Sequence, residues 1–93
     1  MIAPLDWDED KALENLRKHG ISFEEAGTVF LDPLSITIAD RSHSGFEHRF
    51  LDIGASLFGR LIVVSYTERN EKIRIISARQ PTRAERRQYE ENG

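Results

Sequence analysis

The sequence predicts an α+β domain with the element order β-α-α-β-β-β-β-α, and three observations lead to this fold class. Residues 8–31 carry helical apolar spacing with capping signals, whereas residues 34–79 carry alternating and β-branched segments. A further capping signal then opens a C-terminal helix. Because the strand segments have short connections, we expect a mainly antiparallel sheet with the helices packed on one face.

The first elements of the chain are a short strand and a helix. The strand is expected at residues 2–7. Asp8 is a suitable N-cap for the helix, which runs through Lys18 with acidic residues favourably placed in its first turn. Gly20 follows the last basic residues as a C-terminal stop.

A second helix is expected to begin at Ser22 and to end at Asp32, which precedes a proline. Ser22 and Glu25 have the spacing of a capping box, in which each residue satisfies a backbone N–H of the other. The apolar stripe of this helix consists of Phe23, Ala26, Val29 and Phe30.

Four strands are expected next, at residues 34–40, 48–54, 60–68 and 72–79. Strict alternation on the last strand divides its side chains between two faces. One face would carry Ile73, Ile75, Ser77 and Arg79, and the other Arg74, Ile76 and Ala78.

The C-terminal helix is unusual because it has little to bury. Thr82 and Glu85 form a capping box at its start. Its apolar residues are Ala84 and Tyr89, and a spacing of five does not place them on one face. Such a helix is either a solvated face, or is loosely held, or is completed by a partner.

The composition is that of a single globular domain spanning residues 1–93, with no repeat or linker. There are no cysteines, which excludes disulfides and thiol nucleophiles. No phosphate-binding glycine motif, export signal or membrane-length apolar run is visible, so we expect a cytoplasmic protein without a membrane partner.

Charge is unevenly distributed along the chain. Residues 1–40 hold three basic and nine acidic side chains, a net −6, whereas residues 41–93 hold ten and seven, a net +3. The second half can therefore present a basic face to an anionic partner, although the whole chain is net −3.

The histidines do not predict a metal centre. His19 ends a helix, where it complements the helix dipole. His43 and His48 are five apart in a loop near Asp40, Glu47 and Asp52. A metal site there is the weaker interpretation, and solvated loop residues are the stronger one. We predict neither a metal nor a cofactor.

Two arginines flank the junction between the last strand and the last helix. Arg79 ends the strand and Arg83 lies just inside the helix, where free backbone N–H groups also bind anions. Arginine forks suit phosphate oxygens, so this junction predicts a phosphate site. A second polar group comprises Arg41, His43, Glu47, His48 and Arg49, and Glu68 and Arg69 end another strand. Taken singly, these residues are ordinary strand-end polar residues; together they supply acids, bases and phosphate ligands.

Four segments resemble the BrnT family of bacterial type II toxin–antitoxin toxins. They are WDEDKALENLRKHGISFEEAGTVFLDP, DRSHSGFEHRF, IVVSYTER and IRIISARQPTRAERRQYEE, and they cover nearly the whole chain. The resemblance implies a fold similar to the RelE ribonucleases and a metal-independent endoribonuclease that blocks translation. It also implies neutralisation by a BrnA-type antitoxin, which dimerises and carries the DNA-binding domain. Assembly would be a homodimer or a toxin–antitoxin heterotetramer.

The resemblance assigns functional arginines to Arg79, Arg83 and, through a more variable loop, Arg49. We expect Arg79 and Arg83 to hold the scissile phosphate, with Arg49 assisting. Glu68 is the predicted general base, with His48 and Tyr89 as alternatives. Contacts to the RNA backbone without sequence preference are expected from Arg69, Arg74, Arg86 and Arg87.

Two other functions remain as alternatives. The basic face of a non-catalytic module would only dock an acidic partner. A DNA-binding regulator is less favoured, because no helix-turn-helix with an exposed recognition face is apparent.

Overall fold

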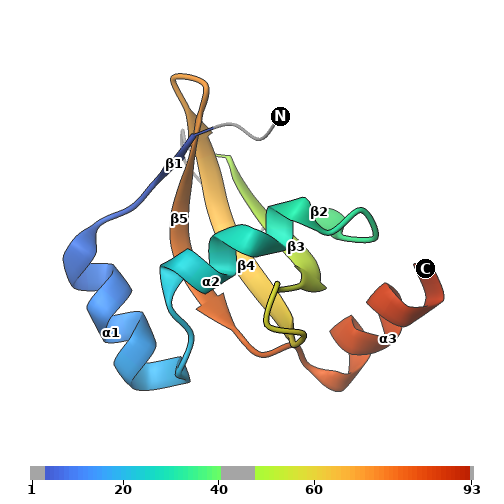
Figure 1. Ribbon diagram of the computed structural model, residues 1–93. Coiled ribbons are helices and arrows are strands. Elements are labelled where there is room, and N and C mark those ends of the chain that lie inside the picture. Colours follow the sequence, from blue (N-terminus) through green and yellow to red (C-terminus); the bar gives the residue numbers. More distant parts are fainter. Residues whose placement is uncertain (1–3, 41–47, 93) are drawn as a thin grey trace.

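The computed structural model describes residues 4–40 and 48–92, which form a five-stranded sheet and three α-helices (Figure 1). The elements in chain order are β1 (Leu5–Asp6), α1 (Glu9–His19), α2 (Phe23–Gly27), the 3-10 helix η1 (Thr28–Leu31), β2 (Ile36–Asp40), β3 (Arg49–Ala55), β4 (Leu61–Arg69), β5 (Lys72–Arg79) and α3 (Arg83–Asn92). The predicted α+β class and element order are confirmed.

The sheet has the strand order β1-β5-β4-β3-β2. Strands β2 to β5 form the predicted antiparallel meander, with a tight turn at Asn70 and Glu71, both at positive φ. Short strand β1 lies parallel to β5, with Leu5 opposite Ile73. The sheet is therefore mixed, with one parallel pair at its edge.

The first helix begins and ends close to the predicted residues. One carboxylate oxygen of Asp8 accepts from the backbone N–H groups of Asp10 and Lys11, at 2.8 and 3.3 Å. Gly20 ends the helix at φ 69°, a left-handed conformation that glycine adopts without strain.

The second helix keeps its α-helical form only to Gly27 and continues as the 3-10 helix η1. The hydroxyl of Ser22 accepts from the N–H of Glu25 at 3.0 Å, as a cap should. The carboxylate of Glu25 does not complete the expected box. It is buried and accepts from Arg60 Nε and Nη2, at 2.8 and 2.6 Å, and from Ser56 Oγ at 2.8 Å.

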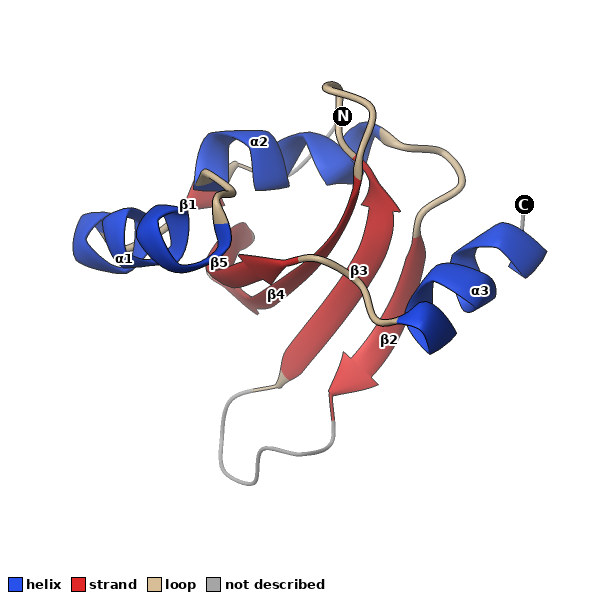
Figure 2. Ribbon diagram, turned by 90° about the horizontal axis from the view of Figure 1, so that it is seen from below, coloured by secondary structure: helices blue, strands red, loops and turns tan. Residues whose placement is uncertain are grey.

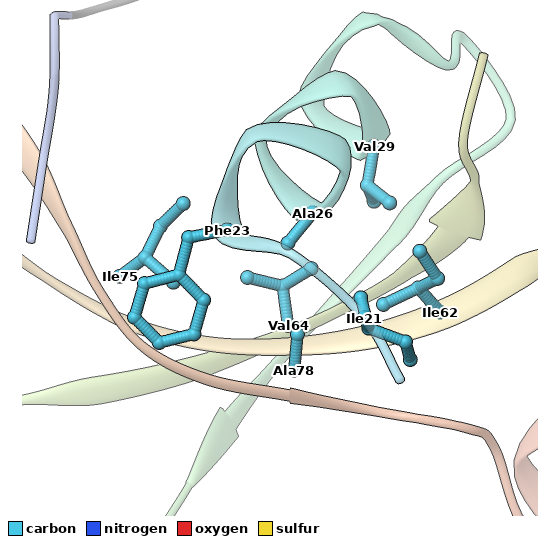
Figure 3. Close-up of a cluster of buried hydrophobic side chains, with 8 residues drawn as sticks. All are labelled: Ile21, Phe23, Ala26, Val29, Ile62, Val64, Ile75 and Ala78. Carbon is cyan, nitrogen blue, oxygen red and sulfur yellow. The ribbon is translucent and has the colours of Figure 1, made fainter. Parts of the chain in front are cut away.

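Helices α1 and α2 cover one face of the sheet, where the main hydrophobic core lies (Figures 1 and 3). The core cluster consists of Ile21, Phe23, Ala26, Val29, Ile62, Val64, Ile75 and Ala78. Trp7 adds an edge-on contact to Phe23, with ring centroids 6.0 Å apart. Helix α3 stands apart from the other helices, beside β2, and none of its residues is buried (Figure 2). The prediction of helices on one face therefore holds for α1 and α2.

A β-bulge in β5 corrects the predicted alternation. Ser65 of β4 pairs with Ser77, but the next residue, Tyr66, pairs with Ile75, so Ile76 is an extra residue. Ile75 and Ala78, three apart, consequently both face the core. Arg79 therefore lies on the face opposite Ile75, contrary to the simple alternation.

Candidate active site

An open groove with a volume of about 310 Å³ lies on the sheet face opposite α1 and α2. Every strand of the meander contributes to its lining, which consists of Asp40, Arg49, Leu51, Val63, Ser65, Ile76, Ser77 and Arg79. Val63 and Ser65 alternate with the core residues Ile62 and Val64, and this alternation places the groove on the other face. The bulge turns Ile76 and Ser77 towards the same groove.

Arg79 is held at the end of β5 by a bidentate ion pair. Its Nη1 donates to Oε1 of Glu85 at 2.7 Å, and its Nη2 donates to Oε2 at 2.9 Å. Nη1 also donates to the carbonyl of Gln80 at 3.2 Å. The backbone before Arg79 is fixed as well, because the side-chain amide of Asn15 bonds both the N–H and the carbonyl of Ala78.

Glu85 belongs to the predicted capping box of α3, which is fully formed. Oε1 of Glu85 accepts from the N–H of Thr82 at 2.8 Å, and Oγ1 of Thr82 accepts from the N–H of Glu85 at 3.2 Å. The hydrogen bond from Arg79, supported by that from Thr82, lowers the pKa of Glu85 to about 2. The carboxylate is therefore charged at every physiological pH.

Arg49 and Asp40 face each other across β2 and β3, as a register pair that lines the same groove as Arg79. Of the described residues, only Asp40 contributes a carboxylate to this lining. Two guanidinium groups suit a phosphate, and a carboxylate beside them can accept a proton. The groove thus brings together two guanidinium groups that can bind a phosphate and one carboxylate that can accept a proton.

Arg83 lies at the start of α3, is exposed and does not line the groove. Within the described part of the chain it has no hydrogen-bonding or ionic partner for its guanidinium group. Arg83 lies next to the strand–helix junction, as the sequence predicts. The guanidinium group of Arg79, on the other side of this junction, is bonded to Glu85.

The structure separates Glu68 from the groove. Val63 is the residue of β4 opposite Arg79, and Glu68 lies five residues further along, about 17 Å at ~3.3 Å per residue. By alternation Glu68 shares the core face with Tyr66, whose pKa its charge helps to raise. A phosphate held by Arg79 would therefore lie far from Glu68, and the role of Glu68 as general base stays a prediction.

The two alternative bases are placed differently. His48 is exposed beside Arg49, and its carbonyl accepts from Thr67 Oγ1 at 2.7 Å. Tyr89 donates its hydroxyl to Oδ2 of Asp32 at 2.6 Å. This hydrogen bond to a carboxylate raises the pKa of Tyr89 to about 12, so its phenol anchors α3 and is a poor base.

The four arginines predicted to contact the RNA backbone lie in three regions. Arg74 forms a 2.6 Å ion pair with Asp6 across β1 and β5, so it is committed to the fold. Arg69 ends β4 at the hairpin tip, at the far end of the strand from Val63. Arg86 and Arg87 are exposed on α3 and remain available to a ligand.

Arg41, His43 and Glu47 lie outside the described residues, so the loop interpretation of the sequence stays a prediction. Over residues 4–40 and 48–92, no group of three or more His, Asp or Glu side chains could hold a metal ion. No helix in these ranges is long and apolar enough to cross a membrane.

Sequence reasoning named Asp40 only as a neighbour of a possible metal site, and it missed both the place of Asp40 in the groove and the pairing of Glu85 with Arg79. Asp40 ends its strand, and only the register of β2 with β3 shows that it faces Arg49. For Glu85 a signal existed, because a capping-box glutamate at the helix start projects back towards the residues that precede it.

Comparison with known proteins identifies the family to which the chain belongs. Residues 7–85 match the family described as "Ribonuclease toxin, BrnT, of type II toxin-antitoxin system". Among solved structures, the crystal structure of the Brucella abortus ribonuclease toxin BrnT matches with a TM-score of 0.68 at 20% identity, covering 87% of this chain and 99% of that chain. No curated protein sequence matches. Since the family match spans most of the chain, the protein belongs to the BrnT family of ribonuclease toxins from type II toxin–antitoxin systems.

Proposed function

We propose that the protein is a metal-independent endoribonuclease that cuts RNA in the groove lined by Arg49 and Arg79 and thereby inhibits translation. The observation that carries this proposal is the convergence of two arginines and one carboxylate on a single open groove, in a chain of a ribonuclease toxin family. Cleavage of RNA without a metal needs charge stabilisation of the phosphate and a proton acceptor for the 2′-hydroxyl.

In this mechanism Arg79 and Arg49 hold the scissile phosphate, and Arg83 approaches it from the start of α3. Asp40 replaces Glu68 as the proposed general base, because it lines the groove that Glu68 does not reach. The 2′-oxygen attacks phosphorus as Asp40 takes its proton, which leaves a 2′,3′-cyclic phosphate. His48, which is exposed and directly precedes Arg49 in the chain, is the proposed acid that protonates the departing 5′-oxygen.

The proposed partner is a BrnA-type antitoxin in the bacterial cytoplasm, with DNA bound only through that antitoxin. A type II toxin requires a protein antitoxin, and the family assignment supports this part of the proposal. The surface offers apolar contacts for it: Leu57 and Phe58 are 70% and 78% exposed in the turn between β3 and β4, and Leu31 is 52% exposed in η1. Assembly as a homodimer or as a toxin–antitoxin heterotetramer remains part of the proposal.

The test compares two carboxylate-to-amide variants, Asp40→Asn and Glu68→Gln, in cleavage of single-stranded RNA with EDTA present. Loss of a general base lowers the rate by about 10²–10⁴-fold, and we expect this loss for Asp40→Asn but not for Glu68→Gln. An Arg79→Ala, Arg83→Ala double variant should lose cleavage as well. Purified protein that binds RNA but cuts none would instead support the non-catalytic docking module.

A further inference from the structure

The guanidinium group of Arg79 has a defined set of free donors. An arginine carries five N–H groups in a planar fork. Three of those of Arg79 are engaged: two on Nη1, by Glu85 and by the carbonyl of Gln80, and one on Nη2, by Glu85. Within the described part of the chain the other two, on Nε and Nη2, have no acceptor. They lie on the same edge of the group and form a two-donor fork for an oxyanion.

Glu85 is well suited to set the direction of this fork. Its side chain is only 17% exposed, against 38% for Arg79, and its carboxylate is also fixed by the N–H of Thr82. Both carboxylate oxygens bind Arg79, so the guanidinium plane cannot rotate while the pair is intact. The first turn of α3 therefore determines the orientation of a group that lines the groove.

A purely electrostatic role would be unfavourable for RNA binding. The negative charge of Glu85 lies directly against the cation that is to meet a phosphate, and it weakens the attraction between them. A capping role alone would not require the charge, because glutamine serves at the same position of a capping box. Orientation of Arg79 is the function that both oxygens and the charge of Glu85 serve together.

We propose that Glu85 is a positioning residue of the ribonuclease site, which orients Arg79 so that its Nε–Nη2 edge meets the scissile phosphate. This inference rests on the proposed function of the groove. It links the start of α3 to the chemistry on the sheet, although Glu85 itself touches no substrate.

The variant Glu85→Gln distinguishes a positioning role of Glu85 from a purely electrostatic role and from a capping role. The amide keeps the shape of the side chain and the capping box, but its nitrogen cannot accept from Arg79. With the guanidinium misaligned, kcat for single-stranded RNA should fall by about 10–100-fold. The equilibrium Kd for the same RNA, measured where cleavage is blocked by a 2′-deoxy substitution, should stay equal or become lower because a negative charge is removed.

Thr82→Ala is the matched control, because it removes the other half of the cap and leaves the bonds between Arg79 and Glu85 in place. Its kcat, corrected for the folded fraction by circular dichroism, should stay within about threefold of wild type, since only a cap is lost. An equal loss of kcat in both variants would show that capping suffices and would overturn the proposal.

The failure of the proposal is distinguishable from failure of the proposed function. If Arg79→Ala cleaves at the wild-type rate, the groove is not the site. If Arg79→Ala is impaired but Glu85→Gln keeps its kcat within about twofold, the groove stands and Glu85 has no positioning role. A rise in Kd for Glu85→Gln that accounts for the whole loss in kcat/KM would likewise overturn it.

Discussion

Asp52 shows, at the scale of a single residue, how the fold accommodates an acid on its core face. Its side chain is 4% exposed and lies near the stacked rings of Phe50 and Tyr66. Oδ1 of Asp52 accepts from Thr37 Oγ1 and from Tyr66 Oη, both at 2.8 Å. Burial raises the pKa of Asp52 more than these two hydrogen bonds lower it, and burial together with Asp52 also raises the pKa of Tyr66.

Because the pKa of Asp52 is raised in the folded state, the stability of the protein depends on pH in a definite direction. The folded protein binds the proton of Asp52 more tightly than the unfolded chain does, whose value is near 3.8. The free energy of unfolding therefore falls as pH rises from 3.8 through the pKa of the folded protein. Below 3.8 this contribution is fully present, because both states are protonated.

We predict that Asp52→Asn removes this loss of stability. The amide oxygen still accepts from Thr37 and Tyr66, but the side chain no longer ionises. Urea denaturation at several pH values from 4 to 8 should show a flatter dependence than wild type, by about 1.4 kcal/mol for each unit by which the pKa is raised. Identical pH profiles for the two proteins would contradict a raised pKa of Asp52.

At the scale of the element, α3 is attached to the body by polar contacts. It has no buried residue, and the sequence offered no apolar stripe to anchor it. The attachment lies instead in the Arg79–Glu85 pair at its start and in the Tyr89–Asp32 hydrogen bond four residues later, about one turn along the helix. Asp32 in turn accepts from the N–H groups of Leu34 and Ala55, which ties the helix to the segment before β2 and to the end of β3.

We predict that Tyr89→Phe loosens α3 without unfolding the sheet. The variant loses one hydrogen bond to a charged group, worth about 1.5–3 kcal/mol, while the aromatic ring is kept. Hydrogen exchange of the amides of residues 86–92 should become about 10–100-fold faster, because opening of the helix needs less free energy. Amides of β4 should be unchanged, and Arg87→Ala serves as the exposed control on the same helix. Unchanged exchange in α3 would mean that Tyr89 does not hold it.

The bulge in β5 is an element-scale feature with a consequence for the site. If Ile76 were paired in strict alternation instead of bulging, Ala78 would leave the core and Arg79 would turn towards the core face. The bulge lets Ile75 and Ala78 share the core while Arg79 lines the groove. An amphipathic pattern interrupted by one residue is thus compatible with a well-packed strand.

At the scale of the whole molecule, the chain is net −3 but places its cations unevenly. Arg49 and Arg79 line the groove, and Arg83, Arg86 and Arg87 are exposed on α3, the helix that follows Arg79 in the chain. Arg74 is instead paired with Asp6 at the β1 edge. A local basic surface can bind a polyanion although the total charge is negative.

We predict that Arg86 and Arg87 contribute to RNA affinity and Arg74 does not. Each phosphate contact to single-stranded RNA adds about 0.7 to the slope of log Kobs against log salt, so the double alanine variant should lower the slope by about 1.4. Arg74→Ala should keep the slope and lower the melting temperature by loosening β1. If the Arg86, Arg87 double variant kept the wild-type slope of log Kobs against log salt, these two residues would not contact the RNA.

Much of this molecule was determined by the sequence by itself. Asp8, Ser22 and Thr82 each cap the helix that they were predicted to begin, because capping depends on residues only two or three positions away. The antiparallel meander followed for the same local reason, since short connections allow few pairings. Segments across nearly the whole chain were sufficient to identify the family, and the family match confirms it.

Only the tertiary structure decided which residues share the site. Register places Asp40 opposite Arg49 and leaves Glu68 far along β4 on the other face, and register depends on pairing between strands. The partner of Glu25 is Arg60, 35 residues away, and that of Tyr89 is Asp32, 57 residues away. Such contacts depend on how the whole chain packs, whereas spacing along the sequence reports only neighbours within a helix or a strand.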